Sequence, residues 1–242
     1  MGLLSKHKKQ PRPVMPIRID MHSHLLPGID DGAQTLEESL DMVRAFQAQG
    51  YTKIITTPHI HSQRYLNTTE DIMHARDILF DAMEKENIRF SVEIAAEYYA
   101  DEHLLKLLEN DDILSFGDKY LLCEFSFLMP PVGTDTIVKE IKNAGYTPVL
   151  AHPERYEYWH NNDSMYNRLR DQGFLFQANM PSCYGLYGPV PKHTFDMLAN
   201  KGWVDFLGSD AHDAATVDLL SEITATDLVQ KIIMHGIRNP YV

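Results

Sequence analysis

The chain has 242 residues and a net charge of −12, and 44% of its residues are hydrophobic. This length suits a single α/β barrel, and the apolar content is sufficient for a sizeable core and argues against intrinsic disorder. No apolar run approaches the roughly 20 residues that a membrane-spanning helix requires. The two cysteines, Cys123 and Cys183, argue against a disulfide framework, and we expect a cytoplasmic protein.

The charge is distributed unevenly. Residues 1–18 hold five basic residues and no acidic residue, so the rest of the chain carries −17. Contacts to a phosphate backbone need basic side chains, so this acidic body predicts no nucleic-acid binding. Three prolines within residues 11–16 oppose helix formation. We interpret residues 1–17 as a basic, flexible leader, with contact to an anionic membrane or partner as the alternative, and residues 18–242 as a single domain.

From residue 17 onward, short apolar runs alternate with segments of helical spacing. The runs predict strands at 17–21, 52–57, 90–96, 120–125, 147–151, 174–178 and 203–208. The helical segments lie at 36–49, 69–86, 101–110, 135–144, 163–172, 190–201, 213–222 and 226–235. This alternation is typical of βαβ units around a parallel sheet. Seven units without a linker favour one closed or nearly closed barrel, with an open doubly wound sheet as the alternative, because periodicity does not reveal strand order.

The first predicted strand ends in two histidines. His22 and His24 are spaced i, i+2, so both side chains point to the same face of a strand and can reach one metal ion. A carboxylate, Asp31, follows seven residues after His24. Such a pair alone is weak evidence in a chain with 12 histidines.

Other predicted strands end in residues of the same kind. In a parallel barrel the C-terminal ends of the strands meet on one face, where active sites lie. We therefore expect five imidazoles and four carboxylates to gather there, from His22, His24, Asp31, His59, Glu97, Glu124, His152, Asp210 and His212.

The order and spelling of these motifs resemble a known superfamily. The motifs are D-x-H-S-H-x5-D-D-G, T-x-H, A-E-Y-Y, E-F-S, A-H-P-E-R-Y and S-D-A-H, spread over about 18–240. They resemble the PHP (polymerase and histidinol phosphatase) metallohydrolases, which are distorted (β/α)7 barrels. Within that superfamily the chain is similar to the bacterial manganese-dependent protein-tyrosine phosphatases of capsular and exopolysaccharide operons.

The resemblance implies three divalent ions, with manganese expected and iron or zinc possible. His22, His24 and Asp210 would hold the first ion, with Glu97 bridging to a second that Glu124 and His152 complete. A third ion would lie between Asp31, His59 and His212. Histidine and carboxylate donors without cysteine are consistent with these metals.

The implied reaction is hydrolysis of phosphotyrosine by a metal-activated hydroxide. Besides Asp210, we expect Arg155 to be catalytic and to bind the phosphoryl oxygens, since a guanidinium can bind two oxygens at once. Arg64 is a weaker candidate for substrate binding. Aromatic residues of the rim loops are candidates for the walls of a slot for the phenol ring, namely Tyr65, Tyr98, Tyr99, Tyr156, Tyr158 and Trp159. The substrate implied by the resemblance is a polysaccharide-export tyrosine kinase.

Other chemistries are excluded or stay open. A cysteine-based phosphatase needs C-x5-R, but Met129 and Pro189 stand six residues after the two cysteines. No glycine-rich nucleotide motif occurs. A PHP phosphoesterase acting on histidinol phosphate or a nucleotide, and a non-catalytic metal-binding regulator, remain alternatives. His61 and His160 are free histidines near the predicted rim, and we expect them to be solvated.

Overall fold

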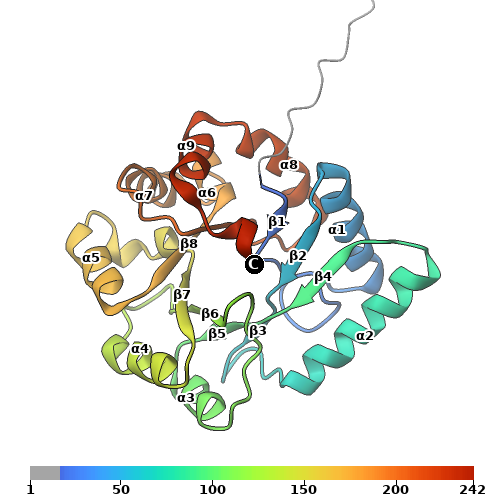
Figure 1. The fold of residues 1–242 in the computed structure, drawn as a ribbon, viewed down its shortest axis with the longest axis horizontal. Coiled ribbons are helices and arrows are strands. Elements are labelled where there is room, and N and C mark those ends of the chain that lie inside the picture. The colour runs from blue at the N-terminus through green and yellow to red at the C-terminus, as the bar shows by residue number, and fades with distance from the viewer. Residues whose placement is uncertain (1–16) are drawn as a thin grey trace, which may run out of the picture.

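The computed structural model describes residues 17–242, in which helices surround a central set of strands (Figure 1). The strands are β1 (Ile19–Asp20), β2 (Lys53–Thr56), β3 (His59–Ile60), β4 (Ser91–Ile94), β5 (Glu97–Tyr99), β6 (Tyr120–Glu124), β7 (Thr147–Ala151), β8 (Leu175–Asn179) and β9 (Phe206–Gly208). The helices are α1 (Leu36–Gln49), α2 (Thr69–Lys85), α3 (Glu102–Glu109), α4 (Thr134–Asn143), α5 (Asp163–Gln172), α6 (Met180–Tyr184), α7 (Pro189–Asn200), α8 (Ala214–Thr224) and α9 (Asp227–Gly236).

All paired strands run parallel, in two sheets ordered β1-β2-β4 and β3-β5-β6-β7-β8-β9. The two sheets are connected along the chain at two places, because β3 follows β2 and β5 follows β4 after two residues each. On the other side, a parallel bridge between Ser23 and Ala211 joins the end of β1 to the end of β9. The arrangement is a distorted (β/α)7 barrel, as predicted, rather than an open doubly wound sheet.

The sequence-based prediction missed the short elements. β3 and β5 have two and three residues and follow a bend in a longer run, where an apolar pattern is too short to detect. The five-residue α6 and the 3₁₀ turns Pro153–Arg155, Glu157–Trp159 and Asn239–Tyr241 were also missed.

The larger helices begin and end close to their predicted bounds because local signals define them. Thr35 and Glu38 form a reciprocal capping box at the start of α1. Gly50 ends this helix in the left-handed conformation, with φ of 88°. Thr68 and Asp71 form the same kind of box before α2. Of the predicted leader, only Ile17 is described, and it is buried; the rest lies outside the described residues.

Apolar side chains fill two regions. The larger core lies between strands and helices, and a smaller one inside the barrel contains Met21, Ile55, Leu122, Val149 and Phe206. At the end of the barrel where the strands begin, Asn239 donates to the carbonyls of Ile19 (3.1 Å) and Leu207 (2.7 Å). The C-terminal segment thus covers this end, and the end of the chain lies near the centre of Figure 1. Within residues 17–242, no helix combines the length and apolarity needed to cross a bilayer.

Candidate metal centre

The C-terminal ends of the strands bring all nine expected metal ligands together. His22, His24 and Glu97 are completely buried, and His152, Asp210 and Glu124 are almost so. Asp31, His59 and His212 are more accessible and lie toward the solvent. The ligand atoms form four overlapping groups, each with all its atoms within 4.8 Å of one another.

The buried half of the centre surrounds His22. Its Nε2 atom lies 3.2 Å from His24 Nε2, 3.1 Å from Glu97 Oε2 and 3.4 Å from Asp210 Oδ1. The other oxygen of Glu97 lies 2.9 Å from His152 Nε2. Glu97 therefore touches both the His22 group and His152, which is a bridging position.

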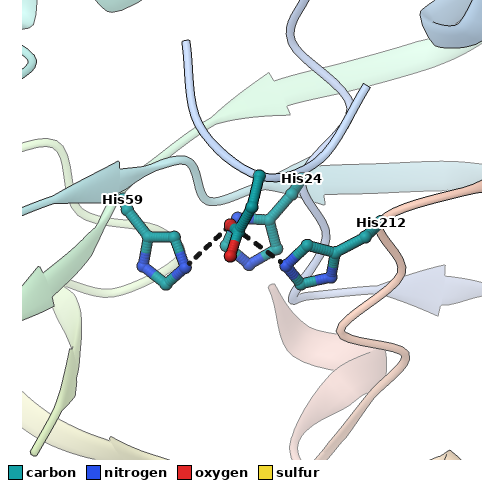
Figure 2. Close-up of side chains that lie close together, drawn as sticks. His24, His59 and His212 are labelled. Carbon is teal, nitrogen blue, oxygen red and sulfur yellow. Dashed lines mark ion pairs between the residues drawn. The ribbon is translucent and has the colours of Figure 1, made fainter. Parts of the chain in front are cut away.

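The outer half surrounds Asp31. Its Oδ1 atom lies 3.4 Å from the Nε2 atoms of both His59 and His212. His24, His59 and His212 converge on this point (Figure 2). The four donors come from three different strand ends, so the barrel itself assembles the group.

Glu124 lies closer to His59 than to His152. Its Oε1 atom is 3.2 Å from His59 Nδ1, whereas its Oε2 atom is 4.0 Å from His152 Nε2. His59 consequently faces Asp31 through one ring nitrogen and Glu124 through the other. The outer and buried groups meet at this residue.

Hydrogen bonds at Nδ1 fix which ring nitrogen of three histidines faces the centre. His22 Nδ1 donates to Gln177 Oε1 (2.8 Å), and His24 Nδ1 donates to Asp30 Oδ2 (2.9 Å). His212 Nδ1 donates to the backbone carbonyl of Asp210 (2.9 Å). In each case the Nε2 lone pair is left to face the other ligands, as in metal sites whose histidines are oriented by a hydrogen bond.

Sequence reasoning missed Asp30 and Gln177. Asp30 adjoins the predicted ligand Asp31, and nothing in the D-D doublet tells which carboxylate orients and which faces the centre. Gln177 lies in a predicted strand, one residue before its end, and its position next to the other strand ends was the only available signal.

The residues present fit bound divalent cations. Ligands on one ion with bonds of about 2.0–2.2 Å are about 3.0–3.4 Å apart, which matches the separations around His22 and Asp31. With both Nδ1 atoms donating elsewhere, the Nε2 atoms of His22 and His24 lie 3.2 Å apart, at a separation at which one cation could bind both. His59 Nδ1 is buried without a hydrogen-bond partner, as a ligand atom would be in a metal-free chain.

The ligands perturb one another's protonation. Burial lowers the pKa of His59, but the charge of Glu97 and the adjacent carboxylates of Asp31 and Glu124 outweigh it and raise the pKa to about 10. Burial raises the pKa of Asp210, but the His22 charge and a hydrogen bond from His24 hold it well below its ordinary value. Without metal, the neighbouring carboxylates thus favour the protonated form of His59.

Two ligand positions have an unusual backbone. His152 has φ of 34° and Asp210 has φ of 50°, in the left-handed region that residues other than glycine rarely adopt. Such strain persists where the surrounding structure enforces it, commonly at functional sites. Here it aims the two side chains into the centre immediately after β7 and β9.

Arg155 lies beside the ligands. Its Nη1 donates to Asp210 Oδ2 at 2.8 Å. Its guanidinium is held between two rings, with Cζ 4.6 Å from the centroid of Phe127 and 4.4 Å from that of Tyr187. Arg64 is far more exposed and lies 3.8 Å from Asp31. Phe127 and Tyr187 were not predicted as site residues.

The centre opens into a cleft of about 580 Å³. Tyr65, Tyr99 and Phe127 line it, as do Arg64, Arg155 and His61. Four aromatic residues that were candidates for its walls are not among its lining residues. Tyr98, Tyr156 and Trp159 are buried in the core, because a 3₁₀ turn folds the latter two inward, and Tyr158 donates to the Ser126 carbonyl instead. His160 is also absent from the cleft and hydrogen-bonds with Thr194.

Known proteins resemble this chain in sequence and in fold. Tyrosine-protein phosphatase YwqE of Bacillus subtilis is 34% identical over 199 residues, which cover 82% of this chain and 78% of YwqE. A chain from the crystal structures of YwqE and of CpsB from Streptococcus pneumoniae, described as unique metal-dependent tyrosine phosphatases, superposes with a TM-score of 0.77 at 30% identity. That superposition covers 89% of this chain and 91% of the other.

More distant structures share the fold alone. Histidinol phosphate phosphatase from Lactococcus lactis, in complex with zinc, L-histidinol and phosphate, superposes with a TM-score of 0.58 at 12% identity and covers 91% of this chain and 94% of that one. The family described as capsular polysaccharide synthesis, CpsB/CapC, matches residues 18–228. On this match and the identity to YwqE, the chain belongs to the CpsB/CapC family.

Proposed function

We propose that this protein is a metal-dependent protein-tyrosine phosphatase. One observation carries the proposal: nine histidine and carboxylate side chains converge at the floor of a cleft, with an immobilised arginine beside them. Phosphate monoester hydrolysis is among the slowest uncatalysed reactions, so it demands such a concentration of charge. The names of the matched relatives, tyrosine-protein phosphatases, support the same reaction.

We propose that His22, His24, Asp31, His59, Glu97, Glu124, His152, Asp210 and His212 hold three divalent ions, with manganese as the native metal. Bound ions would supply Lewis-acid polarisation of the phosphoryl oxygens and would lower the pKa of water. Four carboxylates offset part of the charge of three divalent ions, which leaves a net positive site for a dianionic phosphate. The five imidazoles are neutral donors, so they add no further charge.

Arg155 and Asp210 carry the remaining catalytic work in this proposal. Asp210 faces the ligand cluster through Oδ1 and Arg155 through Oδ2. A phosphoryl group bound at the centre would therefore meet the guanidinium within the same hydrogen-bonded frame. Arg155 binds its oxygens as a fork, while Arg64 at the mouth of the cleft attracts the dianion.

Aromatic rings at the cleft suit a phenyl phosphate. Tyr65 stacks on His59, with ring centroids 5.1 Å apart, and Tyr99 stacks on His61, with centroids 4.0 Å apart. These fixed rings form walls at which a phenol ring can pack. A tyrosine leaving group has a pKa near 10, so its departure depends less on a general acid than that of an alkyl alcohol.

The substrate in this proposal is a phosphotyrosyl protein of the cytoplasm, a tyrosine kinase of capsular or exopolysaccharide synthesis. Membership of the CpsB/CapC family supports the link to capsule synthesis. Both cysteines are free and buried, which is consistent with a reducing compartment.

A substrate panel tests the proposal. Purified protein with Mn²⁺ is assayed on a phosphotyrosyl peptide, a phosphoseryl peptide, histidinol phosphate and a nucleoside monophosphate. We expect kcat/KM for phosphotyrosine to exceed that for every other substrate. Preference for histidinol phosphate or the nucleotide, or a metal-loaded protein inert on all four, would overturn the proposal.

A further inference from the structure

Exposed apolar side chains concentrate on the loop that follows β6. Among the described residues, four of the exposed large apolar side chains lie within 127–132: Phe127, Leu128, Met129 and Val132. Leu128 is 89% and Val132 is 95% exposed. A contiguous apolar patch of this kind on a soluble surface commonly marks an interaction site.

This loop separates two hollows. Phe127 and Leu128 line the cleft above the metal centre. Met129 and the residues up to Val132 line a second hollow of about 480 Å³, which we call the apolar groove. Leu105 of α3 and Ile137 of α4 form its opposite walls.

The apolar groove adjoins the cleft. Tyr99, Phe125 and Ser126 line both hollows, so a single layer of side chains divides them. A peptide whose phosphotyrosine occupies the cleft must leave it across the rim. Extended backbone advances about 3.3 Å per residue, so two to four residues span about 7–13 Å, enough to cross one layer of side chains.

Charge narrows the kind of side chain that fits the apolar groove. Among the described residues that line it, Asp101 and Glu102 are acidic and none is lysine or arginine. Asp101 already accepts hydrogen bonds from Ser62 Oγ and from the backbone N–H of His103. An acidic substrate residue would find repulsion and no cation here, whereas an apolar residue would be desolvated against Met129 and Ile137.

We propose that the apolar groove is a substrate subsite that binds an apolar side chain two to four residues from the phosphotyrosine. This inference rests on the proposed phosphatase function and adds a sequence preference to it. It commits to a phosphotyrosyl protein as occupant because the groove adjoins the cleft in which the phosphate is bound.

Peptide kinetics test the subsite. The peptide set contains one phosphotyrosine, with alanine at all remaining positions from −4 to +4. In each member of the set, a single one of these alanines is replaced by leucine or by glutamate. We expect leucine at one position two to four residues away to raise kcat/KM about tenfold over alanine, and glutamate there to lower it, since one apolar side chain in a pocket gives discrimination of this order.

Two matched variants localise the effect. Met129→Asp places a charge on the groove wall, while Met234→Asp changes an equally exposed methionine on α9 that is not among the lining residues. With rates normalised to hydrolysis of p-nitrophenyl phosphate by the same preparation, we expect Met129→Asp to reduce the leucine-to-alanine ratio to about one. Met234→Asp should retain the full ratio.

Three outcomes would overturn the subsite. One is an equal kcat/KM for all peptides; another is an equal response of the two methionine variants. The third is a dimer, observed by sedimentation, that Met129→Asp dissociates, together with an absence of any peptide preference. That result would show that a second copy of the chain occupies the groove. Failure of the wild-type protein on p-nitrophenyl phosphate and every peptide is a different result, because it would reject the phosphatase function itself.

Discussion

The two ends of the barrel are built from the same strands but contain opposite chemistry. Along β6, Leu122 packs in the apolar interior, and Glu124 two residues later joins the ligand cluster. Ala95 and Glu97 repeat this step around β5. Residues two apart share a face of a strand, so the inward face changes from apolar to ligand as the strands reach their C-terminal ends. One end therefore stabilises the frame and the other does chemistry on it.

Substitution of a candidate metal ligand should have the largest effect, because it should abolish activity and leave the fold intact. We expect His22→Ala or Asp210→Asn to reduce phosphotyrosine hydrolysis by at least about 1,000-fold, because each removes a donor from the charged centre. Near-ultraviolet circular dichroism should remain native. More than about 5% residual activity in either variant would contradict the ligand assignment.

The opposite end should respond in the opposite way. Phe206 is fully buried in the interior cluster, and Phe206→Ala should lower the free energy of unfolding by about 3–5 kcal/mol. Urea denaturation measures this loss. The kcat of the fraction that remains folded should stay within about twofold of wild type, and a collapse of kcat in folded protein would show that the two ends are not independent.

The ring sandwich around Arg155 should show a smaller effect. Arg155→Ala should lower kcat/KM by about 100-fold, as loss of a donor to the transition state does. Tyr187→Leu removes one face of the sandwich and should cost about tenfold. Tyr184→Leu, a partly exposed tyrosine near in sequence, is the control. An equal loss in the two tyrosine variants would rule out positioning of Arg155 by Tyr187.

Proton release on metal binding should be the smallest of the expected effects at the metal centre. The raised pKa of His59, about 10, means that the metal-free protein keeps it protonated at pH 7. Its ion pairs stabilise the metal-free fold fully below the ordinary pKa of 6.5 and are lost as the pH rises toward about 10. Binding of Mn²⁺ should therefore release protons and strengthen between pH 7 and 10.

Calorimetric titration in two buffers of different ionisation enthalpy measures those protons. An identical heat in both buffers at pH 7 would contradict the ion-paired description of the metal-free centre.

Local signals explain why much of the fold was predictable. The capping box at Thr35 and Glu38 and the glycine at position 50 define α1 without reference to the rest of the chain. The convergence of the nine candidate ligands was predictable because strand ends of a parallel barrel converge, whatever the order of the strands. The predicted occupancy and the individual assignments of residues to ions remain predictions.

Features that depend on tertiary contacts could not be predicted from the sequence. The side chains of Tyr156 and Trp159 turn inward because of short 3₁₀ turns that no periodicity reveals. The contact of Glu124 with His59 joins residues 65 positions apart, and the packing of Tyr187 on Arg155 joins residues 32 positions apart. Neither contact leaves a pattern in the sequence.

Metal titration of stripped protein tests the central claim most directly. Protein treated with a chelator should lose its phosphotyrosine phosphatase activity, and stepwise addition of Mn²⁺ should restore it, with saturation near three ions per chain by elemental analysis. Full activity in the stripped protein, or restored activity that His22→Ala shares, would contradict a catalytic metal centre at the C-terminal ends of these strands.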